Sequence, residues 1–177
     1  MKGILYMDAS ILDDPVLFEK GLTLVSEKRK EKVLRYQNSV PARLSLAAGI
    51  LLRIAMEQYG VMDKMNEIMH EEFGKPYLKG TDFSFNLSHS GNYAICAYSD
   101  HRIGADIQFL NKNLPKYTDR ILSESEKTYI MQLNEAERVY VFYELWARKE
   151  SLIKWDGRGL RLPLQELSFV ENNSIVD

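Results

Sequence analysis

The sequence predicts an α+β fold, and three observations support this prediction. Runs rich in β-branched and aromatic residues have the length of strands, and stretches with helical periodicity lie between them. Their order along the chain is strand, helices, three strands, helices, strand. The 177 residues are 45% hydrophobic and 27% charged, which is typical of a folded globular protein and excludes a disordered or low-complexity chain.

The first elements are a strand and two helices. Residues 2–7 are expected to form the strand, and Ser26 is expected to cap a cation-rich helix over residues 28–36. Pro41 lies in the first turn of the next helix and Gly60 lies just past its end. Apolar residues at helical spacing mark this helix as part of the core: Leu44, Ala47, Ala48, Leu51, Leu52, Ala55 and Met56.

The middle of the chain changes to strand character. Residues 63–70 are a further short helical candidate. After them, residues 83–87, 93–98 and 103–107 are expected to be three strands of an antiparallel meander, because turn-forming residues separate them. The chain can be divided into two halves near residue 102.

Helical patterns return in the second half. Two capping boxes mark helix starts: Ser123 with Glu126, and Asn134 with Glu137. The second opens a long helix over residues 135–155, which the glycines of residues 156–159 close. Residues 167–170 are expected to be a last strand.

Charge and cysteine content exclude several classes of protein. The 23 basic and 25 acidic side chains give a net charge of −2, so no overall field attracts nucleic acid or an anionic membrane. Cys96 is the single cysteine, which excludes an internal disulfide and a cysteine-rich zinc site, and we expect it to be buried. No signal peptide or uninterrupted membrane-length apolar run is evident, and we expect a cytoplasmic protein.

Two polar stretches stand out on predicted strands. In residues 86–90, a turn accounts for Ser88 and Ser90, and His89 is either a surface residue or a ligand-binding one. Asp106 and Gln108 point to the same face of a strand. Because an unpaired buried acid is costly, either that face is wet or Asp106 binds a cation or a hydrogen-bond donor.

A third stretch lies on the long helix. Glu150 and Lys154 are four residues apart and share a face. One interpretation is a weak surface ion pair, but Trp146 on the same stripe favours burial.

Together these stretches predict phosphate chemistry. Asp106 and Glu150 offer the hard oxygen ligands that suit Mg²⁺, which usually completes its shell with waters and substrate phosphates. Lys75, His89 and Lys154 could hold phosphate oxygens. The cations of residues 28–32 either do the same or form a solvated face. These residues favour a Mg²⁺-dependent reaction of a pyrophosphate-containing substrate. No P-loop is present, so the usual binding site for a nucleoside triphosphate is excluded.

The chain resembles the 4′-phosphopantetheinyl transferases of the surfactin-synthetase-activating type. The resemblance covers most of the chain and rests on motifs in the family's order: FGKPY at 73–77, FNLSHS at 85–90, GADI at 104–107, WARKESLIK at 146–154 and GRGL at 157–160. It implies transfer of the 4′-phosphopantetheine arm of coenzyme A to a serine of an apo acyl or peptidyl carrier protein, with release of adenosine 3′,5′-bisphosphate. The implied fold is a pseudo-dimer of two similar α+β halves, residues 1–102 and 103–177, with the site in the cleft between them.

The resemblance also implies roles for individual residues. It makes Asp106 and Glu150 ligands of Mg²⁺ or its substitute Mn²⁺, and Gln108 could join them through its carbonyl oxygen. Glu150 and Lys154 are the expected catalytic residues, because the serine proton needs an acceptor and the leaving oxygens need a cation. The residues expected to contact coenzyme A are Lys28, Lys32, Arg43, Lys75, Ser88, His89 and Lys154.

Two departures from the family pattern keep an alternative open. Gln108 stands where the family commonly has a second acid, which removes one negative charge from the metal site. The second half is also short at its C-terminus, so we expect an open sheet edge. The expected state is a monomer that could associate through this edge. The alternatives are a degenerate module that binds coenzyme A or a carrier without transfer, and an interaction protein whose motifs are remnants.

Overall fold

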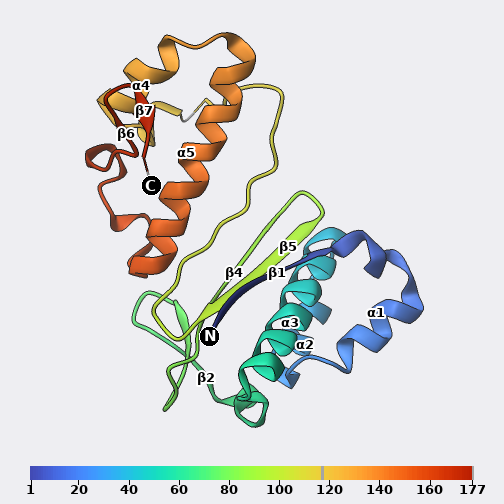
Figure 1. Cartoon of the computed structure of the whole chain (residues 1–177). Helices are drawn as coiled ribbons and strands as arrows, with labels where there is room; N and C mark the ends of the chain where they lie inside the picture. The colour runs from blue at the N-terminus through green and yellow to red at the C-terminus, as the bar shows by residue number, and fades with distance from the viewer. Residues whose placement is uncertain (117, 177) are drawn as a thin grey trace.

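The computed structural model describes residues 1–116 and 118–176, and these form an α+β fold (Figure 1). The helices are α1 (Pro15–Leu22), α2 (Glu27–Leu34), α3 (Ser39–Tyr59), α4 (Glu124–Met131) and α5 (Glu135–Asp156). The strands are β1 (Lys2–Asp8), β2 (Ile68–His70), β3 (Pro76–Leu78), β4 (Ser84–Ser90), β5 (Tyr93–Ser99), β6 (Val170–Glu171) and β7 (Ser174–Ile175). The expected fold class is thus confirmed.

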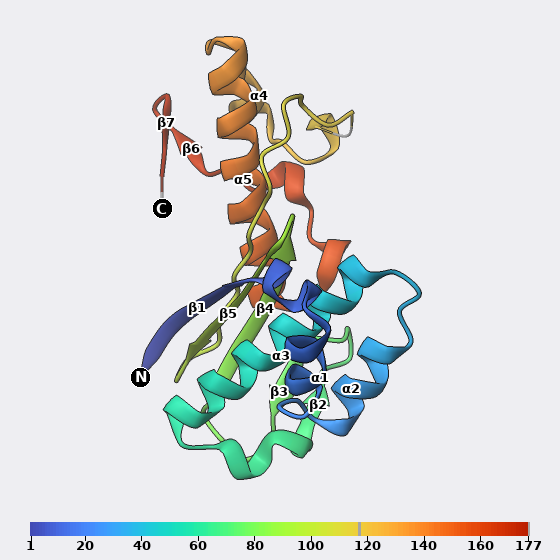
Figure 2. The same cartoon turned by 90° about the vertical axis from the view of Figure 1, so that its right-hand side faces the viewer.

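A three-stranded antiparallel sheet with the order β1-β5-β4 is the framework of the first half. Leu5 of β1 and Leu87 of β4 both pair with Cys96 of the central strand β5. Helix α3 packs against one face of this sheet, and α1 and α2 pack against α3 (Figure 2). Cys96 is buried in the resulting core, as expected.

Helix α3 is the central helix of that core. It ends at Gly60, whose φ of +85° is the left-handed conformation that glycine adopts most easily. By length and composition α3 could cross a membrane, but 67% of its apolar window is buried inside the protein. Its apolar residues are therefore explained by packing against the sheet.

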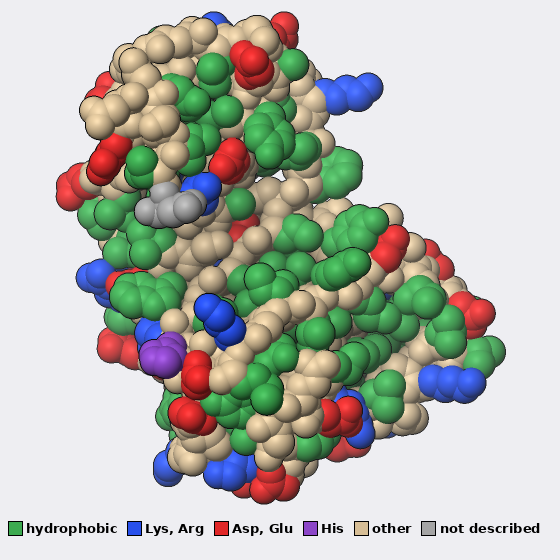
Figure 3. Space-filling model, viewed as in Figure 1, with side chains coloured by type: hydrophobic (Ala, Val, Ile, Leu, Met, Phe, Trp, Pro, Cys, Tyr) green, Lys and Arg blue, Asp and Glu red, His purple; other side chains and the backbone are tan. Residues whose placement is uncertain are grey.

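The second half has its own hydrophobic cluster around α5, including Phe142 and Leu145. Both predicted capping boxes are present, at the starts of α4 and α5, and Gly157 ends α5 with a φ of +90°. The space-filling view shows an indentation between the two halves (Figure 3). The division at residue 102 remains a prediction, which the two separate clusters support.

A buried ion pair organises the second half. The ammonium of Lys149 lies 2.7 Å from Glu126 Oε2, and both side chains are 0% exposed. The same ammonium donates to the carbonyl oxygens of Ile121, Leu164 and Leu167. This pair therefore ties the segment after α5 to the region before α4.

The prediction that residues 103–107 form the third strand of a meander is wrong. This segment is extended but pairs with no strand, because its amides bond to side chains of β4 instead of to a neighbouring backbone. Its β-branched residues fit an extended chain, and only the tertiary contacts decide which partner the backbone finds.

Three other expectations need correction. The helix expected over residues 63–70 is a 3-10 helix (Met62–Glu67) followed by β2, which pairs with β3. The strand expected over residues 167–170 is displaced to the short β6–β7 hairpin. Helix α1 was not predicted, although Asp14 caps it and Pro15 opens it.

Candidate active site

The carboxylate of Asp106 is the meeting point of three elements. Its Oδ1 lies 2.6 Å from Ser88 Oγ of β4 and 2.5 Å from Lys154 Nζ of α5. Lys154 Nζ also donates to Ser88 Oγ at 2.8 Å. The side chain of Asp106 is 3% exposed, so this is a partly buried, charge-assisted triangle. The structure thus brings together three of the predicted site residues.

The alternation of β4 explains how Ser88 reaches this point. Ser84, Asn86, Ser88 and Ser90 occupy alternate positions, and side chains at alternate positions share a face of a strand. This polar face meets residues 103–109. The opposite face carries Phe85 in the hydrophobic core.

Glu150 lies one helical turn before Lys154. Burial raises the pKa of its carboxyl, and the nearby Asp106 carboxylate raises it further, although Lys154 opposes this. Within the described residues, Glu150 forms no hydrogen bond or ion pair. Two carboxylates therefore lie near one another with a single lysine to offset their charge, so the negative charge of Glu150 is only partly compensated.

Gln108 contacts the same carboxylate from the other side. Its amide nitrogen donates to Asp106 Oδ2 at 2.6 Å, so in this state the glutamine acts as a donor. Its carbonyl oxygen, the atom that could bind a metal, is not the one that faces Asp106.

The donor set fits a hard divalent cation that also binds its substrate. Among residues 1–116 and 118–176, no group of three or more His, Cys, Asp or Glu side chains could hold a metal. Asp106 and Glu150 supply two carboxylates, and the partly uncompensated charge of Glu150 would be offset by a cation. Mg²⁺ is commonly bound by one or two carboxylates together with substrate phosphates and waters.

Lys75 is placed differently from Lys154. Its ammonium donates to the carbonyl oxygens of Ile103, at 2.8 Å, and of Lys154. Burial, together with the positive charge of Arg102, lowers its pKa to about 8. In this structure Lys75 therefore binds the C-terminal end of α5, where a cation is favourable next to the helix dipole.

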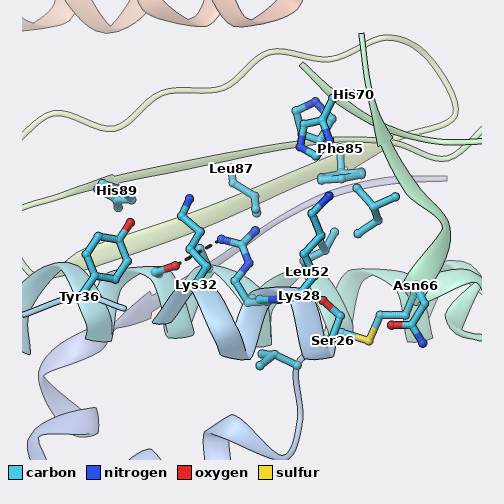
Figure 4. A pocket seen from close by; sticks show the side chains of 18 residues that line it. Ser26, Lys28, Lys32, Tyr36, Leu52, Asn66, His70, Phe85, Leu87 and His89 are labelled. Atoms are coloured by element: carbon cyan, nitrogen blue, oxygen red, sulfur yellow. Dashed lines mark hydrogen bonds between the residues drawn. The ribbon is translucent and has the colours of Figure 1, made fainter. Parts of the chain in front are cut away.

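A pocket of about 370 Å³ opens on the other face of β4 (Figure 4). Lys32 rises from α2 toward Leu87 and His89 of β4, and Lys28 rises from the same helix toward Phe85. Apolar side chains form its floor: Val25, Ala48, Leu52, Met65, Ile68, Pro76 and Phe85. The pocket is suited to a flat, partly apolar group that carries negative charge at one side.

His89 links the pocket to the Asp106 site, because it follows Ser88 on β4. Burial lowers its pKa, and the positive charges of Lys154, Lys32 and Arg29 lower it further. The imidazole is therefore neutral at pH 7 and offers one donor and one acceptor.

Sequence reasoning missed Arg29 and misplaced Arg43 relative to this pocket. Arg29 lines the pocket and its guanidinium donates to Ser45 Oγ at 3.4 Å, the bond that Figure 4 draws. Arg43 is not among the lining residues, and its guanidinium pairs with Asp13. Helical periodicity from Lys28 and Lys32 could have indicated Arg29 only if the buried face of α2 had been known.

Comparison with known proteins identifies the family. A model described as the N-terminal part of 4′-phosphopantetheinyl transferase matches residues 15–101, and one described as the 4′-phosphopantetheinyl transferase superfamily matches residues 102–176. The 4′-phosphopantetheinyl transferase Sfp of Bacillus subtilis (strain 168) is 31% identical over 93% of this chain and 73% of its own length. This chain belongs to the 4′-phosphopantetheinyl transferase family.

Other members of the 4′-phosphopantetheinyl transferase family are similar over most of the chain. The transferase gsp of Aneurinibacillus migulanus is 30% identical over 85% of this chain and 63% of its own length. The L-aminoadipate-semialdehyde dehydrogenase-phosphopantetheinyl transferase of Xenopus laevis is 30% identical over 82% of this chain and 53% of its own length. The expected family and enzyme class are therefore confirmed, and the general reaction is phosphopantetheine transfer.

Proposed function

We propose that this transferase moves the 4′-phosphopantetheine arm of coenzyme A to a serine hydroxyl of an apo acyl or peptidyl carrier protein, with Mg²⁺ at Asp106 and Glu150. The observation that carries the proposal is the convergence of Lys154 with the two carboxylates of Asp106 and Glu150. Such a site suits a pyrophosphate, whose charge needs both a divalent cation and a lysine.

The chemical step exchanges one phosphorus–oxygen bond for another. The serine oxygen attacks the phosphorus that carries pantetheine, and the bond to the bridging oxygen of the pyrophosphate breaks. The leaving group is adenosine 3′,5′-bisphosphate. Glu150 takes the serine proton.

Lys154 changes its partners in this proposal when the substrate binds. In the substrate-free protein it pairs with Asp106 and Ser88. When the pyrophosphate arrives, its ammonium binds phosphate oxygens and stabilises the charge that develops on the leaving group. Mg²⁺, when bound, would offset the negative charge of the pyrophosphate, and Asp106 and Glu150 would hold it, joined by Gln108 if its amide turns its oxygen inward.

The pocket beside α2 is the proposed nucleotide site. Lys28, Lys32 and Arg29 supply positive charge for the adenosine bisphosphate, and the apolar floor accepts the base. Ser88 and His89 would contact phosphate oxygens where the pocket meets the Asp106 site. Lys75 and Arg43 are kept as proposed ligands, and each would first have to release its present partners.

The test is intact-mass spectrometry of an apo acyl carrier protein and an apo peptidyl carrier domain incubated with this protein, coenzyme A and Mg²⁺. The expected result is the gain of one phosphopantetheine, lost with EDTA and restored by Mg²⁺ or Mn²⁺. If the folded protein modifies neither carrier, the proposal is contradicted.

We further propose that the transferase acts as a cytoplasmic monomer.

One observation favours a second candidate function. Gln108 donates to Asp106, and a neutral amide binds a cation less strongly than an acid does. A module that binds coenzyme A or a carrier without transfer would show heat of coenzyme A binding by calorimetry and leave the carrier unmodified. Restoring the charge with Gln108→Glu would strengthen the dependence on Mg²⁺ if the transferase proposal is right.

A further inference from the structure

The polar face of β4 binds residues 103–109 through its side chains. Ser84 Oγ accepts from the amide of Ile103 at 3.2 Å, and Asn86 Oδ1 accepts from the amide of Ala105 at 3.0 Å. Ser90 Oγ accepts from the amide of Phe109 at 2.9 Å. In all three contacts the partner lies 19 positions further along the chain, so the segment follows β4 in constant register.

Ser88 is the exception within this series, and it is the position where the chemistry lies. Its hydroxyl bonds to the side chain of Asp106, 18 positions ahead, rather than to a backbone amide. The hydrogen bonds that Asn86 and Ser90 accept thus flank Asp106, the proposed metal ligand. They fix the backbone on both sides of it.

Asn86 has the least freedom of the three acceptors. It is 5% exposed, so the amide of Ala105 has no ready access to water if the side-chain oxygen is removed. Ala105 precedes Asp106 directly, and any shift of its amide moves the carboxylate relative to Lys154. On the other side, Gly104 packs against the backbone of α5 near Ser151.

We infer that Asn86 is a positioning residue, which together with Ser84 and Ser90 holds residues 103–109 so that the Asp106 carboxylate lies within reach of both Lys154 and Glu150. The inference rests on the proposed function for its catalytic consequence. The Asn-x-Ser-x-Ser pattern of residues 86–90 then has a role beyond contact with substrate. Its alternate side chains accept the backbone hydrogen bonds that a neighbouring strand would otherwise accept.

The experiment compares three variants. Asn86→Leu keeps the branched shape and removes the acceptor, and the double variant Ser84→Ala/Ser90→Ala removes the outer acceptors with a smaller change. Ser99→Ala is the matched control, because Ser99 is a buried serine of the same sheet whose hydroxyl bonds to Asp100 and His101 instead. Each variant is examined by amide hydrogen exchange and by steady-state transfer to the carrier.

We expect Asn86→Leu to speed exchange at Ala105 while the β4–β5 amides stay protected. We expect kcat to fall by about 10- to 100-fold, with KM for coenzyme A changed less than about threefold, because a misplaced catalytic group costs rate and not ground-state binding. The double serine variant is expected to show a smaller fall in kcat, and Ser99→Ala none.

If Asn86→Leu speeds hydrogen exchange at the Ala105 amide but leaves kcat unchanged, the inference is overturned. A higher KM with unchanged kcat would also overturn it, because Asn86 would then serve substrate binding. If the unsubstituted protein modifies no carrier, the proposed function fails, and the exchange pattern alone decides whether Asn86 holds this segment.

Discussion

Asp106 and Lys154 are 48 positions apart in the chain, and their charged groups lie 2.5 Å apart. The aspartate is almost fully buried and the lysine is partly exposed. This contact joins the segment beside β4 to helix α5. It places both groups next to Glu150, so the properties of the site depend on how α5 is held against the first half.

Glu150→Gln should reduce transfer by about 100-fold or more, because it removes the proposed base. Steady-state transfer to the carrier at saturating Mg²⁺ measures this. A variant that retains full activity would contradict the role of Glu150.

The same variant should be more stable than the parent at pH 7. The folded-state pKa of Glu150 is raised, so the folded protein favours the protonated form and loses stability as the pH rises through that range. Glutamine mimics the protonated acid and escapes this loss. Urea unfolding should show that Glu150→Gln raises the free energy of unfolding more at pH 7 than at pH 4.5. An equal increase at both pH values would contradict a raised pKa of Glu150 in the folded protein.

Lys32→Ala should raise KM for coenzyme A by about 5- to 10-fold and leave kcat nearly unchanged, because its charge would act in binding. The effect should weaken as salt screens the charge. Lys30→Ala is the matched control, since Lys30 lies on the same helix but does not line the pocket. Equal effects of the two substitutions would indicate a general charge effect instead of a pocket contact.

Gly104→Ala should destabilise the protein by about 2 kcal/mol and lower activity. A methyl group at this position would overlap the carbonyl oxygen of Ser151 and the backbone nitrogen of Trp155, and helix backbone cannot move aside as a side chain can. Denaturant unfolding and transfer assays check this. Unchanged stability would show that α5 does not pack as closely as described.

Lys149→Met should cost about 3–5 kcal/mol of unfolding free energy, because it leaves the fully buried Glu126 carboxylate without its partner. The double variant Lys149→Met/Glu126→Gln should recover part of this loss. Chemical denaturation of the single and double variants gives the coupling. If the losses simply add, the pair does not act as a unit.

Lys75 gives a second pH test. Its folded pKa of about 8 lies below the unfolded value of 10.5, so its charge costs stability below pH 8, and that cost disappears as the pH rises toward 10.5. The stability of the parent relative to Lys75→Met should therefore increase by about 2 kcal/mol from pH 7.5 to pH 10. A constant difference across this range would mean that Lys75 is not held in its buried position.

Local sequence signals determined much of the fold. The capping boxes of α4 and α5 and the glycine ends of α3 and α5 depend on interactions within a few residues, and these predictions were confirmed. The motifs also pointed to Ser88, Asp106, Glu150 and Lys154, and the structure brings these side chains together, while their roles stay predictions.

The tertiary structure decided what local signals leave open. An extended run such as residues 103–107 can pair with a strand or with side chains, and only the approach of β4 selects the second. The ammonium of Lys75 goes to the end of α5 and the guanidinium of Arg43 to Asp13, while Arg29 lines the pocket. Long cationic side chains bind whichever partner the packed elements bring near them, and sequence spacing does not specify that partner.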